Sequence, residues 1–202
     1  MQSPRVAGIL LAAGAGSRLG RPKALVEIGG QRLVDRGVLL LRAGGAGPIV
    51  VVTGAVPVDM PGALVVHNPA WSTGMGSSLT AGLSVLGALP ADACGAAVIA
   101  LADQPLVTPE CVRRLIAAHV GNPGASIAVA SYGGRPRNPV LIAREHWAEV
   151  LTLAHGDAGA RPFLRAHPGL VTLVECGDAG SPDDIDTPED LARVTQIAAK
   201  GE

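Results

Sequence analysis

VAGILLAAGAGSRLGRPKAL, residues 6–25, is the part of the sequence that best predicts the fold. Its beginning belongs to a short apolar run, residues 5–11, which predicts a buried strand of a parallel sheet. Glycine and alanine follow at once, and such small residues let backbone N–H groups approach an anion closely. Arg18 and Lys23 then add positive charge beside the same turn, and both side chains suit phosphate oxygens. The pattern indicates an anion-binding loop after the first strand.

Two well-known phosphate-binding patterns do not match this loop. A P-loop requires GxxxxGK[ST], whereas Lys23 is preceded by Pro and followed by Ala. A dinucleotide fingerprint requires GxGxxG, whereas Gly14, Gly16 and Gly20 are spaced GxGxxxG. That fingerprint also needs a carboxylate for the ribose at the end of the second strand, where Thr53 stands. A plain strand–helix turn without a ligand remains an alternative.

Strands and helices alternate through the first 120 residues. Apolar runs predict strands, and apolar residues that recur every three or four positions predict helices. Such a βαβ series is typical of an α/β fold with a mostly parallel sheet. The expected strands are residues 5–11, 48–53, 63–67 and 96–101, and the expected helices are residues 33–42, 76–86 and 109–119, the last with Thr108 as N-cap and Pro109 at its first position.

The rest of the chain has shorter and mixed elements. A Gly133-Gly134 turn separates strands expected at residues 126–130 and 138–142, which we expect to pair antiparallel. Short helices at 144–151 and 160–166, a strand at 170–175 and a final helix follow. Thr187 and Asp190 form a capping-box pattern at the start of that final helix. No linker divides the chain, so we expect one domain over residues 1–202 with subregions 1–120 and 121–202.

The composition excludes several classes of protein. Of the 202 residues, 48% are hydrophobic, which suits a folded domain and not a disordered chain. The net charge is −1, without the basic excess that is typical of nucleic-acid-binding proteins. Aromatic residues make up 2%, which leaves few platforms for stacking bases. We therefore expect no nucleic-acid partner.

Cysteine usage and hydropathy indicate a cytoplasmic protein. Cys94, Cys111 and Cys176 are an odd number of cysteines without a CxxC pair, which favours free buried thiols over a disulfide framework or a zinc site. No segment approaches the roughly 18 apolar residues of a membrane span. We expect neither membrane insertion nor a secretory signal.

The string LAAGAGSRLGRPKAL, residues 11–25, resembles the signature LAxGxGxRxGxPKxL of nucleotidyltransferases with a glycosyltransferase-A-like fold. Within that group the chain resembles the molybdenum-cofactor nucleotidyltransferases, the MobA-like NTP transferases, and most of all their cytidylyl-transferring members. The resemblance implies a three-layer αβα fold with a twisted, mostly parallel, Rossmann-like sheet and a short antiparallel portion. It implies that residues 1–120 bind the nucleotide and that Arg18 and Lys23 hold the triphosphate. The nucleotide-binding residues implied in this loop are Leu11, Ala12, Ala13, Gly14, Ala15, Gly16, Ser17, Arg18 and Lys23.

Two acidic segments are candidate metal ligands. Asp103 follows the apolar run 96–101, and ligands of open parallel sheets bind outside the carboxyl ends of the strands. Asp184 and Asp186 lie on one side of an extended chain and Ile185 on the other. Carboxylates in such places suit Mg²⁺, which bridges to phosphates. The resemblance implies that Asp103 and Asp186 are the metal ligands; a loop-turning Asp and a solvated loop with a helix cap are the alternatives.

Three further segments complete the expected site. Residues 68–79 carry hydroxyls and exposed backbone at a helix N-terminus, and the resemblance implies that they lie against the nucleobase. Residues 134–139 and 156–161 resemble segments of the cytidylyl-transferring members, although Arg137 stands where Gly is usual. An N-capped helix and surface arginines are the alternatives. The residues singled out are Gly74, Ser77 and Ser78 for the nucleotide, and Arg137, Asn138, Asp157 and Arg161 for the acceptor.

These observations predict a Mg²⁺-dependent nucleotidyltransferase in which Arg18, Lys23 and Asp103 are catalytic. The Leu11-Ala12-Ala13-Gly14 form resembles the cytidylyl-transferring members, so we expect CTP as donor and a phosphorylated acceptor such as molybdopterin. A molybdoenzyme or its chaperone is the expected protein partner. Relatives of this family also include nicotinamide-nucleotide-dependent reductases of the pigment nicotine blue, which is the second hypothesis. A catalytically silent nucleotide-binding regulator is the third.

Overall fold

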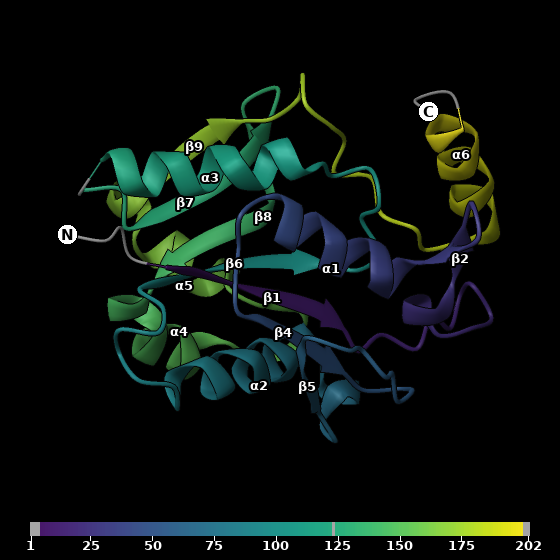
Figure 1. Cartoon of the computed structure of the whole chain (residues 1–202), viewed down its shortest axis with the longest axis horizontal. Helices are drawn as coiled ribbons and strands as arrows, with labels where there is room; N and C mark the ends of the chain where they lie inside the picture. Colours follow the sequence, from purple (N-terminus) through teal and green to yellow (C-terminus); the bar gives the residue numbers. More distant parts are fainter. Residues whose placement is uncertain (1–4, 123, 200–202) are drawn as a thin grey trace.

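The computed structural model describes residues 5–122 and 124–199. A seven-stranded sheet runs through its centre in the order β5-β4-β1-β6-β8-β7-β9 (Figure 1). Strands from both parts of the chain, before and after residue 120, belong to this one sheet. The strands are β1 (Val6–Ala12), β4 (Ile49–Thr53), β5 (Leu64–His67), β6 (Ala96–Leu101), β7 (Ile127–Tyr132), β8 (Arg135–Ala143) and β9 (Val171–Glu175).

The sheet is mostly parallel, as predicted. β1 pairs in parallel with β4 and β6, and β4 pairs in parallel with β5. β8 is antiparallel to both β6 and β7, so the predicted hairpin after Gly133-Gly134 is confirmed. All seven residues of β1 are buried because the strand is central and helices cover both faces of the sheet.

Helices form a layer on each face of the sheet, which confirms the predicted three-layer architecture (Figure 1). α1 (Leu33–Ala43) and α3 (Pro109–Gly121) pack on one face through residues such as Leu41 and Leu115. α2 (Met75–Gly87), α4 (Trp147–Leu153) and α5 (Arg161–Ala166) pack on the other face, around Leu83 and Phe163. Each face therefore has its own apolar cluster.

A third, smaller apolar cluster docks the end of the chain beside the first loop. It joins Val26, Ile28 and Leu33 to Ile185 and Val194. The sequence did not predict the short hairpin of β2 (Glu27–Ile28) and β3 (Gln31–Arg32) that carries part of this cluster. In Figure 1, α6 (Pro188–Ala198) lies next to β2, apart from the central layers.

The two predicted helix starts with a threonine cap differ in detail. At α6, Thr187 accepts a hydrogen bond from the backbone N–H of Asp190, and the Asp190 carboxylate accepts one from that of Thr187, so the capping box is confirmed. At α3, Thr108 occupies the N-cap position but makes no capping bond. Its hydroxyl donates instead to the carbonyl of Ala179 at 2.6 Å, because the segment before Asp184 passes beside it.

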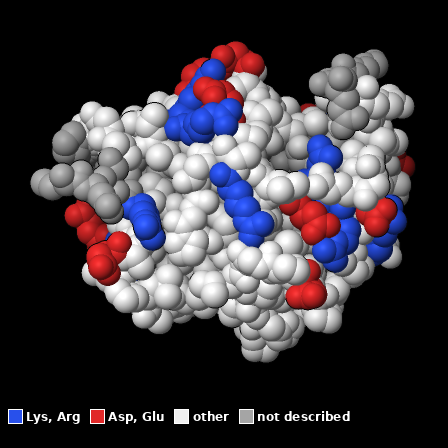
Figure 2. Space-filling model, in the orientation of Figure 1, with Lys and Arg blue, Asp and Glu red and all other residues white. Residues whose placement is uncertain are grey.

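The three cysteines are buried and free, as expected. Within residues 5–122 and 124–199, no helix combines the length and apolar character that a membrane span requires. On the face shown in Figure 2, basic and acidic side chains lie in several small groups, some mixed and some of one sign, separated by uncharged surface. This arrangement differs from the continuous basic stripe that follows a nucleic-acid backbone.

Candidate active site

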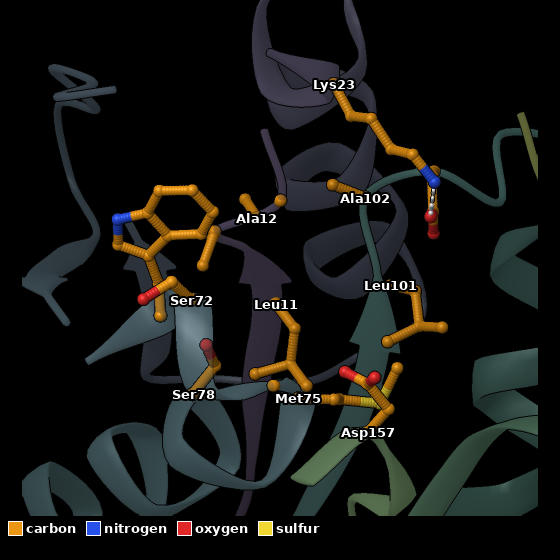
Figure 3. A pocket seen from close by; sticks show the side chains of 14 residues that line it. Leu11, Ala12, Lys23, Ser72, Met75, Ser78, Leu101, Ala102 and Asp157 are labelled. Carbon is orange, nitrogen blue, oxygen red and sulfur yellow. Dashed lines mark hydrogen bonds and ion pairs between the residues drawn. The ribbon is translucent and has the colours of Figure 1, made fainter. Parts of the chain in front are cut away.

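A pocket of about 360 Å³ opens at the carboxyl ends of β1 and β6. This is the edge at which ligands bind in open α/β sheets. Figure 3 shows Leu11 in the middle of the pocket, with Ser72 and Ser78 to one side and Asp157 near Met75. The pocket is lined by Leu11, Ala12, Ala13, Gly14, Lys23, Trp71, Ser72, Gly74, Met75, Ser78, Leu101, Ala102, Asp103 and Asp157.

Two basic and two acidic side chains meet at one end of this pocket, and we call them the charged centre: Arg18, Lys23, Asp103 and Asp186. The Lys23 Nζ donates hydrogen bonds to the carboxylates of Asp103 and Asp186, at 2.6 Å in each case. The Arg18 guanidinium lies 2.9 Å from the second carboxylate oxygen of Asp186. Lys23 and Asp186, which are 163 positions apart in the sequence, thus belong to one network.

The charges of this centre stabilise one another. Burial acts to lower the pKa of Lys23, but the charges of Asp103 and Asp186 and the hydrogen bonds to them outweigh it, and the pKa lies above its ordinary value. The hydrogen bond from Lys23 holds the pKa of Asp186 below its ordinary value, and Arg18 adds to this effect. Lys23 is therefore protonated and Asp186 ionised at neutral pH.

Backbone pairing brings Asp186 to Asp103. Residues 181–185 run beside residues 103–106 in the opposite direction, because Ile185 N–H donates to the carbonyl of Asp103 and Ser181 N–H to that of Leu106. Ile185 is fully buried in the third apolar cluster. Side chains alternate along an extended chain, so burial of Ile185 directs its two acidic neighbours to the other side, as predicted.

The glycine-rich loop folds back on itself between Gly14 and Lys23. The Leu19 N–H donates to the carbonyl of Gly16 at 2.9 Å, and Lys23 N–H approaches that of Gly14 at 3.4 Å. Gly16 has a φ of +61°, and a Cβ there would overlap the carbonyl oxygen of Arg21. The fold of this loop therefore requires glycine at position 16, and it turns Lys23 toward the pocket.

Asn68 orders the far side of the pocket. Its side chain is buried and donates to the hydroxyls of Ser77 at 2.8 Å and Ser78 at 3.1 Å. Ser78 lines the pocket, whereas Ser77 donates to the backbone carbonyls of Ala70 and Gly74. Of these two hydroxyls, only that of Ser78 belongs to the pocket lining.

Two glycines let the segment carrying Asp157 approach the start of α2. Gly74 has a φ of +115°, and a Cβ there would overlap the backbone of Gly156. A Cβ on Gly76 would lie 2.7 Å from the backbone nitrogen of His155. This close backbone approach places Asp157 in the pocket wall, across from the loop of Lys23.

The structure brings together many of the residues predicted for the site, but not all of them. Leu11, Ala12, Ala13, Gly14, Lys23, Gly74, Ser78, Asp103 and Asp157 line the pocket, and Arg18 and Asp186 join it through the charged centre. The remaining predicted residues lie outside the lining: Ala15, Gly16, Ser17, Ser77, Arg137, Asn138 and Arg161.

The predicted acceptor residues are the most widely separated. Arg137 is exposed, and its guanidinium donates to the carbonyl of Pro136 at 3.1 Å. Arg161 is exposed at the start of α5, and Asn138 lies on β8. The assignment of these residues to the acceptor stays a prediction.

Sequence reasoning missed five lining residues: Trp71, Ser72, Met75, Leu101 and Ala102. Trp71 packs so closely on Gly54 that a Cβ on this glycine would lie 2.5 Å from it. A signal was present, because Trp71 and Ser72 belong to the segment expected against the nucleobase. Leu101 and Ala102 directly precede Asp103, so a strand that ends in the site also predicts their position.

The donor set of the charged centre suits a hard divalent cation. Asp103 and Asp186 offer carboxylate oxygens on either side of a cation, the Lys23 ammonium. Among the described residues no group of three or more His, Cys, Asp or Glu has the arrangement to hold a metal ion. Two carboxylates, with the remaining positions taken by water and phosphate oxygens, match the habit of Mg²⁺. These residues therefore fit a divalent cation shared with a phosphate substrate.

Comparison with known families agrees with this geometry. Residues 8–171 match the MobA-like NTP transferase domain, and the chain belongs to this family. Its fold is the nucleotide-diphospho-sugar transferase fold of solved nucleotidyltransferases. The predicted family and fold class are thereby confirmed.

Individual relatives differ in their named activities. Nicotine blue oxidoreductase from Paenarthrobacter nicotinovorans is 37% identical over 202 residues, with 95% of this chain and 97% of the relative covered. Molybdenum cofactor guanylyltransferase from Rhodobacter capsulatus is 30% identical over 199 residues, with 94% of each chain covered. A Mycobacterium sp. strain JC1 homologue of Mycobacterium tuberculosis Rv0371c superposes with a TM-score of 0.81 at 28% identity, over 98% of each chain.

Divalent metal binding is typical of this family. Rv0371c of Mycobacterium tuberculosis has been solved in complex with manganese, and this structure matches with a TM-score of 0.71 at 25% identity. It covers 96% of the present chain and 100% of its own.

Proposed function

We propose that this protein transfers a nucleotidyl group, CMP from CTP, to a phosphorylated small molecule and releases pyrophosphate. The observation that carries the proposal is the charged centre, in which Lys23 and Arg18 meet Asp103 and Asp186 at the edge of the pocket. Phosphoryl chemistry needs such a place, where positive groups face developing negative charge and carboxylates face a cation.

The residues of the charged centre act on the triphosphate. An acceptor phosphate oxygen attacks the α-phosphate in line, a new P–O bond forms, and the bond to pyrophosphate breaks. Lys23 and Arg18 exchange their carboxylate partners for triphosphate oxygens and neutralise the charge that develops during transfer. Positioning and charge neutralisation supply the rate, and no protein nucleophile is required.

Asp103 and Asp186 would hold the divalent cation, which we propose is Mg²⁺. When bound, the cation supplies charge neutralisation and orients the phosphates. Asp103 fits this role because it lies two residues after the end of β6. Asp186 fits it because backbone pairing places it on the other side of the same ammonium group.

The part of the pocket that lies across Leu11 from the charged centre suits the nucleobase. Ala13 is nearly buried and lines the pocket, so its methyl limits the room beside the base and favours a pyrimidine. The Ser78 hydroxyl is available for hydrogen bonding to the base. Molybdopterin is the acceptor we propose, and Asp157, Arg137, Asn138 and Arg161 are the residues we propose for it.

A transfer assay tests the proposal. The purified protein, CTP, Mg²⁺ and molybdopterin are mixed, and pyrophosphate release is measured together with the mass of the product. We expect stoichiometric pyrophosphate and an acceptor heavier by one CMP unit. Absence of both, from protein that binds CTP, would exclude this acceptor, and absence of CTP and GTP binding would exclude the function.

The second candidate is a nicotinamide-nucleotide-dependent reductase of nicotine blue. It is favoured by the 37% identity to nicotine blue oxidoreductase, above the 30% identity to the guanylyltransferase. Against it, β4 ends in Thr53 with no carboxylate for a ribose, and the glycine spacing is longer than a dinucleotide fingerprint requires. A thermal-shift panel of CTP, GTP, NADH and NADPH with Mg²⁺ separates the two, because each candidate predicts stabilisation by a different cofactor class.

A further inference from the structure

Gln104 is a buried polar residue that the proposed chemistry does not use. It directly follows Asp103, and 5% of it is exposed. Its side-chain amide donates two hydrogen bonds, to the carbonyl of Pro182 at 3.0 Å and to the carboxylate of Asp184 at 2.6 Å. Both partners belong to the segment that carries Asp186, about 80 positions away in the sequence.

The amide completes a backbone pairing that proline interrupts. The segments pair through Ile185 N–H to the carbonyl of Asp103 and Ser181 N–H to that of Leu106. Pro182 lies between these two bonds and has no N–H to donate. The amide of Gln104 instead gives the Pro182 carbonyl a donor, and so joins the middle of the two segments.

Asp184 and Asp186 have different hydrogen-bond partners, although the two side chains lie on one side of the chain. Asp186 bonds the two basic groups of the charged centre, whereas Asp184 bonds Gln104. The Gln104 amide is buried, and a buried donor without an acceptor costs free energy, so the bond to Asp184 stabilises the contact between the two segments.

We propose that Gln104 and Asp184 form a positioning pair, which holds Asp186 opposite Asp103 at the separation that one shared cation requires. This inference rests on the proposed function, in which Asp103 and Asp186 hold the cation. Neither Gln104 nor Asp184 belongs to the lining of the pocket. In the present structure the shared cation is the Lys23 ammonium, 2.6 Å from both carboxylates.

An exchange of the two side chains tests the pair. Gln104→Glu places two carboxylates against each other and removes the donor to Pro182. Asp184→Asn in the same chain restores a hydrogen bond between positions 104 and 184 with donor and acceptor exchanged. The single variant is thus expected to loosen the segment, and the double variant to restore it in large part, short of the bond to Pro182.

Two measurements are made on each variant. Amide deuterium exchange of residues 181–187, without metal or nucleotide, reports whether the segment is held. Binding of Mn²⁺ in the presence of CTP, followed by electron paramagnetic resonance, reports whether Asp103 and Asp186 are in place. Gln104→Glu is expected to speed the exchange and to weaken Mn²⁺ affinity by about 10- to 100-fold, the usual cost of losing a group that orients metal ligands.

A matched control is Gln196→Glu, which makes the same chemical change at an exposed position of α6. It is expected to alter neither measurement. The proposed positioning pair is overturned if residues 181–187 of the Gln104→Glu variant exchange their amide protons at the wild-type rate. It is also overturned if adding Asp184→Asn does not slow this exchange again. Wild-type protein that binds no Mn²⁺ with CTP overturns the proposed function instead, and the exchange comparison still decides whether the pair holds the segment.

Discussion

Two glycine-containing turns of this protein follow strands of the same sheet and carry basic residues, yet their surroundings differ. In the loop after β1, Lys23 is nearly enclosed, with 17% of its side chain exposed, and it bonds two carboxylates. Next to the turn between β7 and β8, Arg135 and Arg137 at the start of β8 are exposed. There the Glu175 carboxylate accepts hydrogen bonds from the backbone N–H groups of Gly133 and Gly134.

Small residues and basic side chains do not make a charged site by themselves. The loop after β1 lies at the carboxyl ends of parallel strands, where other segments deliver acidic residues. The other turn ends an antiparallel hairpin, and its nearest carboxylate is used to hold the turn itself. A similar local sequence therefore lies beside a charged pocket in one region and in a hydrogen-bonded turn in the other.

Removal of Lys23 is expected to have the largest effect. Lys23→Ala should lower the rate of transfer by the equivalent of about 2–4 kcal/mol in transition-state stabilisation, with the fold retained. Arg135→Ala, which removes a basic residue from the other turn, should leave the rate nearly unchanged. Steady-state rates and circular dichroism of both variants check this. Full turnover by folded Lys23→Ala protein would contradict the assignment of the charged centre.

Loss of the carboxylate of Asp103 or of Asp186 is expected to weaken binding of the divalent cation. Asp103→Asn and Asp186→Asn should each weaken Mn²⁺-dependent CTP binding by at least about 10- to 100-fold, because losing even an orienting group costs that much. Asp178→Asn, at an exposed carboxylate paired with Arg114, is the control and should bind normally. Calorimetric titrations measure all three, and unchanged metal dependence in both site variants would refute the cation site.

Nucleotide choice is expected to depend on the methyl of Ala13. CTP should be preferred over GTP, and Ala13→Gly should narrow the preference, because one methyl in a pocket contributes about 1–3 kcal/mol. The measurement is kcat/KM for each nucleotide. An unchanged preference in Ala13→Gly would shift the selection to the Ser78 hydroxyl, and a GTP preference in the wild type would contradict the cytidylyl assignment.

The smallest effect is expected at the hairpin turn, and it depends on pH. Hydrogen bonds from the backbone N–H groups of Gly177, Gly133 and Gly134, with one from Ser131, lower the pKa of Glu175 to about 2. A lowered pKa means that the ionised group stabilises the fold above its ordinary pKa, near 4.5, and that this stability is lost as the pH falls toward about 2.

Melting temperatures of wild type and Glu175→Gln measure this contribution across the acid range. The wild type should melt higher above about pH 5, and the two curves should converge near pH 2. The difference should be small because Glu175 is exposed to solvent. A gap that persists at pH 2 would show that the glutamate acts by shape and not by charge.

Much of the fold could be predicted from local patterns. The run 96–101 predicts a strand with the bounds that β6 has. Thr187 and Asp190 predict the capping box at the start of α6. These signals are local, because apolar runs and caps depend on neighbours a few positions away. The hairpin of β2 and β3 gave no such signal, since each strand has two residues and is held by the third apolar cluster.

Local patterns in the sequence predict the parallel sheet, the glycine loop and the candidate site residues Lys23, Asp103 and Asp186. How these three side chains meet depends on tertiary contacts. Ile185 is buried in the third apolar cluster, and Gln104 donates hydrogen bonds to Pro182 and Asp184. These contacts determine which side of residues 181–186 faces Asp103. Glycines at positions 74 and 76 let Asp157 reach the pocket. The physical reason is that these contacts join residues about 80 or more positions apart, and local sequence patterns carry no information about such distances.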